Sequence, residues 1–211
     1  MTNMPLNIVA LAGSLRAESF NRKALRIAGA IASEFGAHVH EVDLKALDLP
    51  VFNADLRELG FPGSVMTLKR EIESADMLLI ATPEYNHSVP GPLKNAIDWA
   101  SDKTNPFQGK VAAIFGVSTG LVGTLRAQLH LREILGSLGV LIVPQPQVLI
   151  RSASKAFQLD GSFVDVKVRD QLKLLIEESM KLAKKIRKLE QIFQGEQQGK
   201  KGISQKMDHA V

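Results

Sequence analysis

Residues 6–21 read Leu-Asn-Ile-Val-Ala-Leu-Ala-Gly-Ser-Leu-Arg-Ala-Glu-Ser-Phe-Asn. The first seven of them, Leu6 to Ala12, are almost wholly apolar, which is typical of a strand buried on both faces of a parallel sheet. Gly13 allows the chain to turn, and a helix is expected to begin at about Ser19. The order of buried strand, glycine turn and helix indicates the first unit of an α/β fold.

The loop between this strand and this helix carries groups that suit a phosphate. Ser14, Ser19 and Asn21 supply hydroxyl and amide donors, and Arg16 adds a cation. The free N–H groups and the dipole of a helix N-terminus favour an anion. From these residues alone a plain helix cap, with Arg16 solvated, stays equally open, since serine is a common capping residue. The glycine fingerprint of dinucleotide-binding folds and the Gly-Lys-Ser/Thr end of a P-loop are absent, which disfavours a pyrophosphate or a nucleoside triphosphate.

Strand-like and helix-like segments alternate along the rest of the chain. Five strands with intervening helices require right-handed crossovers, and they predict an α/β fold with a mainly parallel sheet covered on both faces. The predicted strands are 6–12, 38–44, 76–82, 110–118 and a fifth that begins at 140–143, and the predicted helices are 19–35, 63–74, 90–101, 124–138 and 165–193.

Composition bounds the class of protein and its compartment. The 211 residues suit one domain, expected over 1–194, followed by a mobile tail at 195–211 that is rich in Gln, Gly and Lys. The chain has no cysteine, which excludes disulfides, thiolate metal sites and cysteine nucleophiles, including those of the low-molecular-weight tyrosine phosphatases. No apolar run is long enough to span a membrane and no secretory signal is evident, so we expect a cytoplasmic protein without membrane insertion.

The net charge of +4 does not indicate a nucleic-acid partner. From Lys181 onward there are eight basic and three acidic residues, whereas the preceding 180 residues hold 18 basic and 19 acidic ones. The body is therefore almost neutral, and no aromatic residues interleave with the basic ones to stack on bases. We interpret the basic end as the solvated face of a helix and a frayed tail.

Two further loops follow the third and fourth predicted strands. Residues 82–99 read Thr-Pro-Glu-Tyr-Asn-His-Ser-Val-Pro-Gly-Pro-Leu-Lys-Asn-Ala-Ile-Asp-Trp, and residues 116–123 read Gly-Val-Ser-Thr-Gly-Leu-Val-Gly. Tyr85 offers a flat wall for a planar ring, while the glycines at 120 and 123 let the main chain approach closely. Each loop alone is compatible with an ordinary turn before a helix. Because parallel strands bind ligands beyond their carboxyl ends, three such loops together favour a binding site.

These stretches make the chain similar to the NADPH-dependent FMN reductase family. Gly-Ser-x-Arg-x-x-Ser at 13–19, Pro-Glu-Tyr-Asn at 83–86 with its Leu-Lys-Asn-Ala-Ile-Asp-Trp continuation, and Ser-Thr-Gly at 118–120 carry the resemblance, which extends over residues 6–146. It is closest to the bacterial quinone reductases that are also called chromate reductases. The resemblance implies a flavodoxin-like three-layer sandwich with a five-stranded parallel sheet of order 2-1-3-4-5.

The resemblance also implies a cofactor, a reaction and site residues. Noncovalent FMN would take a hydride from NAD(P)H and pass electrons by a ping-pong mechanism to quinones, free flavin, chromate, ferric chelates or azo compounds. No side chain is assigned as a catalytic acid, base or nucleophile. The expected FMN-binding residues are Ser14, Arg16, Ser19 and Asn21 at the phosphate, Pro83, Glu84, Tyr85 and Asn86 at the ribityl chain and ring, and Ser118, Thr119 and Gly120 at the other ring edge.

Several alternatives stay open at this point. A flavodoxin-type electron carrier is disfavoured because such carriers are typically acidic and have a Thr-rich phosphate loop, and a flavin-sensing binding module is a further possibility. His38 and His40 share a strand face but have no evident third metal ligand, so no metal site is expected. The resemblance implies a homodimer or homotetramer; Arg126, Arg132 and Glu133 are candidate interface residues, unless they form only a solvated helix face.

Overall fold

The fold is built on a parallel sheet whose order is β2-β1-β3-β4-β5, with β6 also paired to β4. The computed structural model describes residues 4–208, without the side chains of 194–208. The strands are β1 (Asn7–Ala12), β2 (His38–Val42), β3 (Met77–Ala81), β4 (Val111–Val117), β5 (Leu141–Ile142) and β6 (Val148–Ile150). Every strand pair is parallel, so the predicted fold class and the order of the first five strands are confirmed.

The edge strand beside β4 is divided into two pieces. β5 pairs with β4 at Val111 and Ala112, and β6 pairs with it from Phe115 to Val117. The sequence predicted one fifth strand beginning at 140–143 and did not predict β6. Between the two pieces lie Pro144 and Pro146, which have no backbone N–H to donate to a neighbouring strand. The sheet therefore has a sixth strand, and its outer edge is interrupted.

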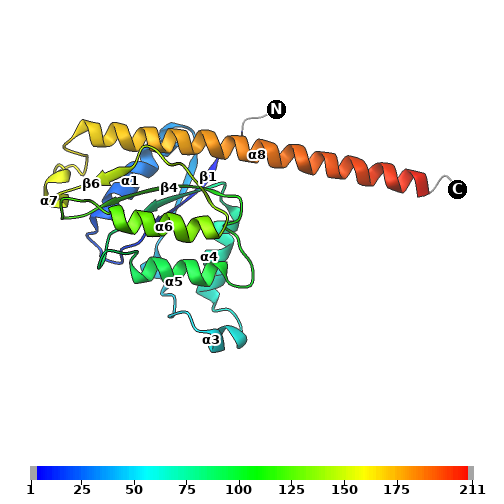
Figure 1. The fold of residues 1–211 in the computed structure, drawn as a ribbon, viewed down its shortest axis with the longest axis horizontal. Coiled ribbons are helices and arrows are strands. Elements are labelled where there is room, and N and C mark those ends of the chain that lie inside the picture. Colours follow the sequence, from blue (N-terminus) through cyan, green and yellow to red (C-terminus); the bar gives the residue numbers. More distant parts are fainter. Residues whose placement is uncertain (1–3, 209–211) are drawn as a thin grey trace.

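Helices cover both faces of the sheet and make three layers (Figure 1). One face packs on α1 (Phe20–Glu34) and α8 (Val166–Asp208), and the other on α4 (Gly63–Ser74), α5 (Gly91–Ser101) and α6 (Leu125–Ser137). Alternate residues of each inner strand point to opposite faces of the sheet. In β1, Ile8 and Ala10 pack in the core beneath α1 and α8, and Val9 and Leu11 pack in the core beneath α4, α5 and α6. Burial on both faces explains why these strands are continuously apolar.

The long helices agree with those predicted from the sequence, whereas the short helices were not predicted. The four predicted helices before the last begin and end within a residue of α1, α4, α5 and α6. Three short helices, α2 (Leu44–Leu47), α3 (Ala54–Glu58) and α7 (Ala153–Ala156), lie where no helix was predicted, and α2 begins at Leu44, which was predicted to end the second strand. Among the described residues, none of the helices is both long and apolar enough to cross a membrane.

The last helix is longer than predicted. α8 continues to Asp208, well past the end expected near Phe193, and its distal part extends away from the body (Figure 1). The buried side chains of α8 that the structure describes run from Leu172 to Ala183, all in the part that crosses the sheet. The predicted mobile tail thus has a helical backbone over 195–208, while 209–211 lie outside the described residues. Its mobility and the boundary at 194 stay predictions.

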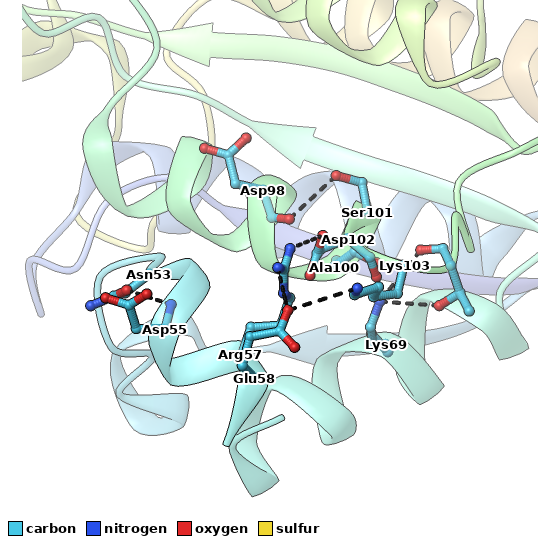
Figure 2. A network of polar contacts seen from close by, with 11 residues as sticks. Asn53, Asp55, Arg57, Glu58, Lys69, Asp98, Ala100, Ser101, Asp102 and Lys103 are labelled. Carbon is cyan, nitrogen blue, oxygen red and sulfur yellow. Dashed lines mark hydrogen bonds and ion pairs between the residues drawn. The ribbon is translucent and has the colours of Figure 1, made fainter. Parts of the chain in front are cut away.

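A polar network ties α3 and α4 to the end of α5 (Figure 2). The Lys69 ammonium, on α4, donates to the carbonyl oxygens of Ala100 at 2.8 Å and Asp102 at 2.7 Å, and to the Thr104 hydroxyl at 3.1 Å. Arg57 of α3 reaches the Asp102 carboxylate at 3.4 Å. The last carbonyl groups of a helix lack partners within it, so a cation there satisfies them. Burial lowers the pKa of the Lys69 ammonium, while the Asp102 carboxylate acts in the opposite direction.

Lys69→Met should therefore lower the free energy of unfolding. The side chain keeps its length, but three acceptors lose a charged donor, which typically costs about 1.5–3 kcal/mol. The measurement is urea unfolding followed by circular dichroism. Lys181→Met is the matched control, because it removes an exposed lysine paired with Glu177, and exposed ion pairs contribute little to stability. Equal losses in the two variants would contradict the structural role of the network.

Candidate functional site

The predicted binding loops meet at one edge of the sheet. β1 and β3 end at the same level, because Ala12 pairs with Ala81; Ala81 in turn pairs with Phe115 of β4, which continues to Val117. A cavity of about 160 Å³ lies beyond these ends. It is lined by Ser14, Arg16, Ser19, Phe20, Asn21, Pro83, Glu84, Tyr85, Val117, Ser118 and Thr119. Nine of the eleven predicted site residues are in this lining; Asn86 and Gly120 are not. Their roles as cofactor ligands stay predictions.

The loop after β1 passes tightly between its neighbours at Gly13. Its N–H donates to the Ala81 carbonyl at 2.9 Å, which continues the β1–β3 pairing by one residue. A side chain at this position would place its Cβ 2.9 Å from Pro90 Cγ and 3.2 Å from Pro83 Cδ. Such contacts are too close for a carbon atom, so glycine is required for the loop to lie against the start of α5.

The N-terminus of α1 presents hydroxyl groups and a positive potential to the cavity. Ser19 is the N-cap, and its hydroxyl oxygen accepts from the Arg22 N–H at 3.4 Å; the Ser14 oxygen accepts from the Arg16 N–H at 3.4 Å. Both serines are 4% exposed, and both keep their hydroxyl hydrogens for another acceptor. Arg16 is exposed beside them, and the first turn of α1 contains no acidic residue. The set fits a phosphate.

Asn21 has a structural partner that the sequence did not reveal. Its side-chain amide donates to the Val117 carbonyl at 2.9 Å and accepts from the Val117 N–H at 2.8 Å. The side chain thus pairs with the end of β4 as a neighbouring strand would, and it fixes the first turn of α1 against the sheet. One amide hydrogen is left for a ligand, so the predicted phosphate contact is compatible with this arrangement.

The loop after β3 forms a tight turn whose tip is exposed. Tyr85 and Ser88 exchange two backbone hydrogen bonds of 3.1 and 3.0 Å, and the residues between them, Asn86 and His87, have φ of 48° and 64°. Two central residues with positive φ are the geometry of a type I′ turn, here closed by the isolated bridge between Tyr85 and Ser88. The Tyr85 side chain is 50% exposed, as a surface that receives a planar ring requires.

The loop after β4 depends on the two elements that the sequence missed. The Ser118 N–H donates to the Ile150 carbonyl at the end of β6, and the Ser118 carbonyl accepts from the Ala153 N–H at the start of α7, both at 3.0 Å. The Ser118 hydroxyl in turn accepts from the Gly120 N–H at 3.2 Å. β6 and α7 therefore hold the backbone of this side of the cavity.

A second, larger cavity lies on the other side of the β1–α1 loop. It measures about 450 Å³ and is mainly apolar; Leu15, Leu44, Leu49, Val51 and Pro92 are among its lining residues. No sequence motif marked this cavity, since its residues come from three separate segments. Among the side chains that the structure describes, those of residues 4–193, no three His, Asp or Glu are grouped as a metal site would require. His40 lies 3.6 Å from Glu71.

The fold and the site define a flavodoxin-like α/β protein with a polar cavity at the carboxyl edge of its sheet. The family model for NADPH-dependent FMN reductase matches residues 6–155. The chain belongs to the NADPH-dependent FMN reductase family, as the sequence motifs predicted. Membership makes it an FMN-containing oxidoreductase with NAD(P)H as the co-substrate.

Individual relatives agree with this assignment. An NAD(P)H-dependent FMN reductase of Pseudomonas aeruginosa is 44% identical over 166 residues, which cover 78% of this chain and 88% of the relative. A quinone reductase of Escherichia coli is 41% identical over 150 residues, covering 68% and 77% of the two chains. Among solved structures, the NAD(P)H:(acceptor) oxidoreductase FerB of Paracoccus denitrificans has a TM-score of 0.77 and 35% identity, covering 85% of this chain and 98% of FerB.

Arg16→Ala should weaken the binding of FMN by about tenfold, because the phosphate loses a charge-assisted contact. Titration of the apoprotein with FMN, followed by flavin fluorescence, measures the effect. Riboflavin lacks the phosphate, so its affinity should not change. Arg26→Ala, which removes an exposed arginine on the same helix outside the cavity, should change neither affinity. An unchanged FMN affinity in Arg16→Ala would place this side chain outside the site.

Proposed function

We propose that this protein reduces quinones with electrons from NAD(P)H by means of FMN held in the 160 Å³ cavity and over its open side. The observation that carries the proposal is the pair of buried hydroxyls, Ser14 and Ser19, set at the N-terminus of α1 with Arg16 beside them. The names of the relatives, an FMN reductase and a quinone reductase, support the reaction.

The residues present fit FMN in its separate parts. Ser14, Ser19 and Arg16 would hold the phosphate, while the exposed face of Tyr85 and the Ser118–Thr119 backbone would contact the ring system. The cavity itself is small, so it would take the phosphate end and leave the ring accessible to other molecules. Bound FMN supplies the hydride acceptor and electron donor that amino-acid side chains lack.

The protein's own contribution is then to position the reactants. No acid, base or nucleophile is assigned, since hydride and electron transfer need orientation and a polarising environment rather than a protein proton. An accessible ring accounts for broad acceptor use, so chromate, free flavin, ferric chelates and azo compounds are proposed as further acceptors beside quinones. The cytoplasmic location expected from the sequence stays a prediction.

The kinetics should follow a ping-pong pattern. If NAD(P)H and quinone use the same face in turn, initial-rate plots at several fixed quinone concentrations should be parallel. Steady-state oxidation of NADPH and NADH with a panel of acceptors provides the data. Intersecting lines would require both substrates to bind at once. A protein that binds FMN without turnover would instead be a sensor, and one that only exchanges single electrons with protein partners would be a carrier.

We also propose that the molecule works as a homodimer or homotetramer. Leu121, Val122 and Leu129 support this, because these apolar side chains are 78%, 43% and 50% exposed on α6 and the loop before it. Of the predicted interface residues on α6, Arg126 pairs with Glu84 of its own chain, Arg132 donates to the Val143 carbonyl, and Glu133 is exposed.

Sedimentation at low micromolar concentration should show a species larger than the 23.0 kDa monomer. Leu129→Glu should shift it toward the monomer, because a charge replaces an apolar contact. A wild-type monomer with full quinone reductase activity would refute the oligomer and leave the proposed chemistry unaffected.

A further inference from the structure

The carboxylate of Glu84 lies at the start of α6 rather than free in the cavity. Its Oε2 accepts from the backbone N–H groups of Arg126 at 2.9 Å and Ala127 at 3.2 Å. The Arg126 guanidinium adds a contact of 3.4 Å to Oε1, and the Glu84 side chain is only 10% exposed. A carboxylate at this position satisfies two orphan donors and complements the helix dipole.

The helix has no equivalent cap of its own. Thr124, the N-cap of α6, makes no capping hydrogen bond through its side chain in the part of the chain that the structure describes. Its hydroxyl oxygen instead accepts from the Gln128 amide at 3.1 Å. Glu84, 42 residues away in the loop after β3, therefore takes the role that serine, threonine or aspartate usually takes at the N-cap.

A second contact fastens the other end of the same loop to α6. The Ser88 hydroxyl and His130 Nδ1 lie 3.0 Å apart in a hydrogen bond. Between Glu84 and Ser88 is the tight turn that carries Tyr85, closed by its own two backbone hydrogen bonds. The turn is thus held by α6 on both sides of the residue that is proposed to face the ring.

We infer that Glu84 is a positioning residue for FMN, which acts by fixing the loop after β3 to the first turn of α6. This inference rests on the proposed function. α6 directly follows the loop after β4, so the contact sets the separation of the two loops between which the ring is proposed to lie. A ring that fits between two fixed loops loses affinity when one of them becomes free to move, because binding must then order that loop.

The test compares apoprotein variants in two measurements. The first is titration with FMN and with riboflavin; the second is hydrogen–deuterium exchange of the Arg126 and Ala127 amides without any flavin. Glu84→Ala removes the cap, and Glu84→Gln keeps one acceptor oxygen of the same reach. Asp165→Ala is the matched control, because it removes another carboxylate cap, to the Lys167 N–H at 2.9 Å, from a helix start that does not line the cavity.

Glu84→Ala should raise the dissociation constants of FMN and riboflavin alike, by about tenfold. This differs from Arg16→Ala, which affects FMN alone. Exchange at Arg126 and Ala127 should already be faster in the apoprotein. Glu84→Gln should restore most of both properties, and Asp165→Ala should leave flavin affinity unchanged.

Three outcomes would overturn the inference. Unchanged flavin affinity in Glu84→Ala would show that the contact does not matter for binding, and lost affinity with unchanged amide exchange would make Glu84 a direct ligand. A wild-type protein that takes up no FMN would contradict the proposed function as well as this inference. The first two outcomes contradict only the inference, so the two kinds of failure are distinguishable. If Glu84→Ala does not fold, Glu84→Asp, whose reach is shorter, should show both effects in weaker form, and its failure to do so counts against the inference.

Discussion

The parallel register of β1, β3 and β4 is the constraint from which the site follows. The backbone bonds from Gly13 to Ala81 and from Thr82 to Phe115, both 2.9 Å, extend the pairing just past the last residues of β1 and β3. Three loops must therefore leave the sheet side by side, whatever their sequences. The fold contributes a common edge, and the loop residues contribute the chemistry, as is usual for open parallel sheets.

The loops are held in place by contacts within the protein. Asn21 pairs with Val117, Glu84 caps α6, and Ser118 is held by β6 and α7. Each contact uses a polar group that would otherwise lack a partner at a strand or helix end. Gly116 adds to this, because any side chain there would collide with the Thr82 carbonyl and the Thr124 hydroxyl, beneath two of the loops. Such contacts would hold the loops in place independently of a ligand, which would reduce the conformational entropy lost on binding.

The features that could be predicted from the sequence are those that depend on the pattern of neighbouring residues. Continuous apolar runs marked the inner strands, helical spacing marked the five long helices, and glycine and serine motifs marked nine residues that line one cavity. The sequence could not predict contacts between distant segments. Asn21 meets Val117 across 96 residues and Glu84 meets Arg126 across 42, and neither pairing leaves a local signal. β6 was not predicted because three residues after two prolines are too few to show a hydrophobic periodicity. The end of α8 was predicted too early because the glycine at 195 is a typical helix stop signal.

The divided edge of the sheet has a consequence for the chain before it is fully folded. An outer strand with a long row of free N–H and C=O groups can recruit strands from other molecules. Here that edge consists of two residues and then three, separated by a segment in which Pro144 and Pro146 have no N–H to offer. The opposite edge, β2, is five residues long and carries Glu41. The β5–β6 border therefore offers an incoming strand no continuous partner, and the same irregularity that limits strand recruitment at this edge supports the loop after β4.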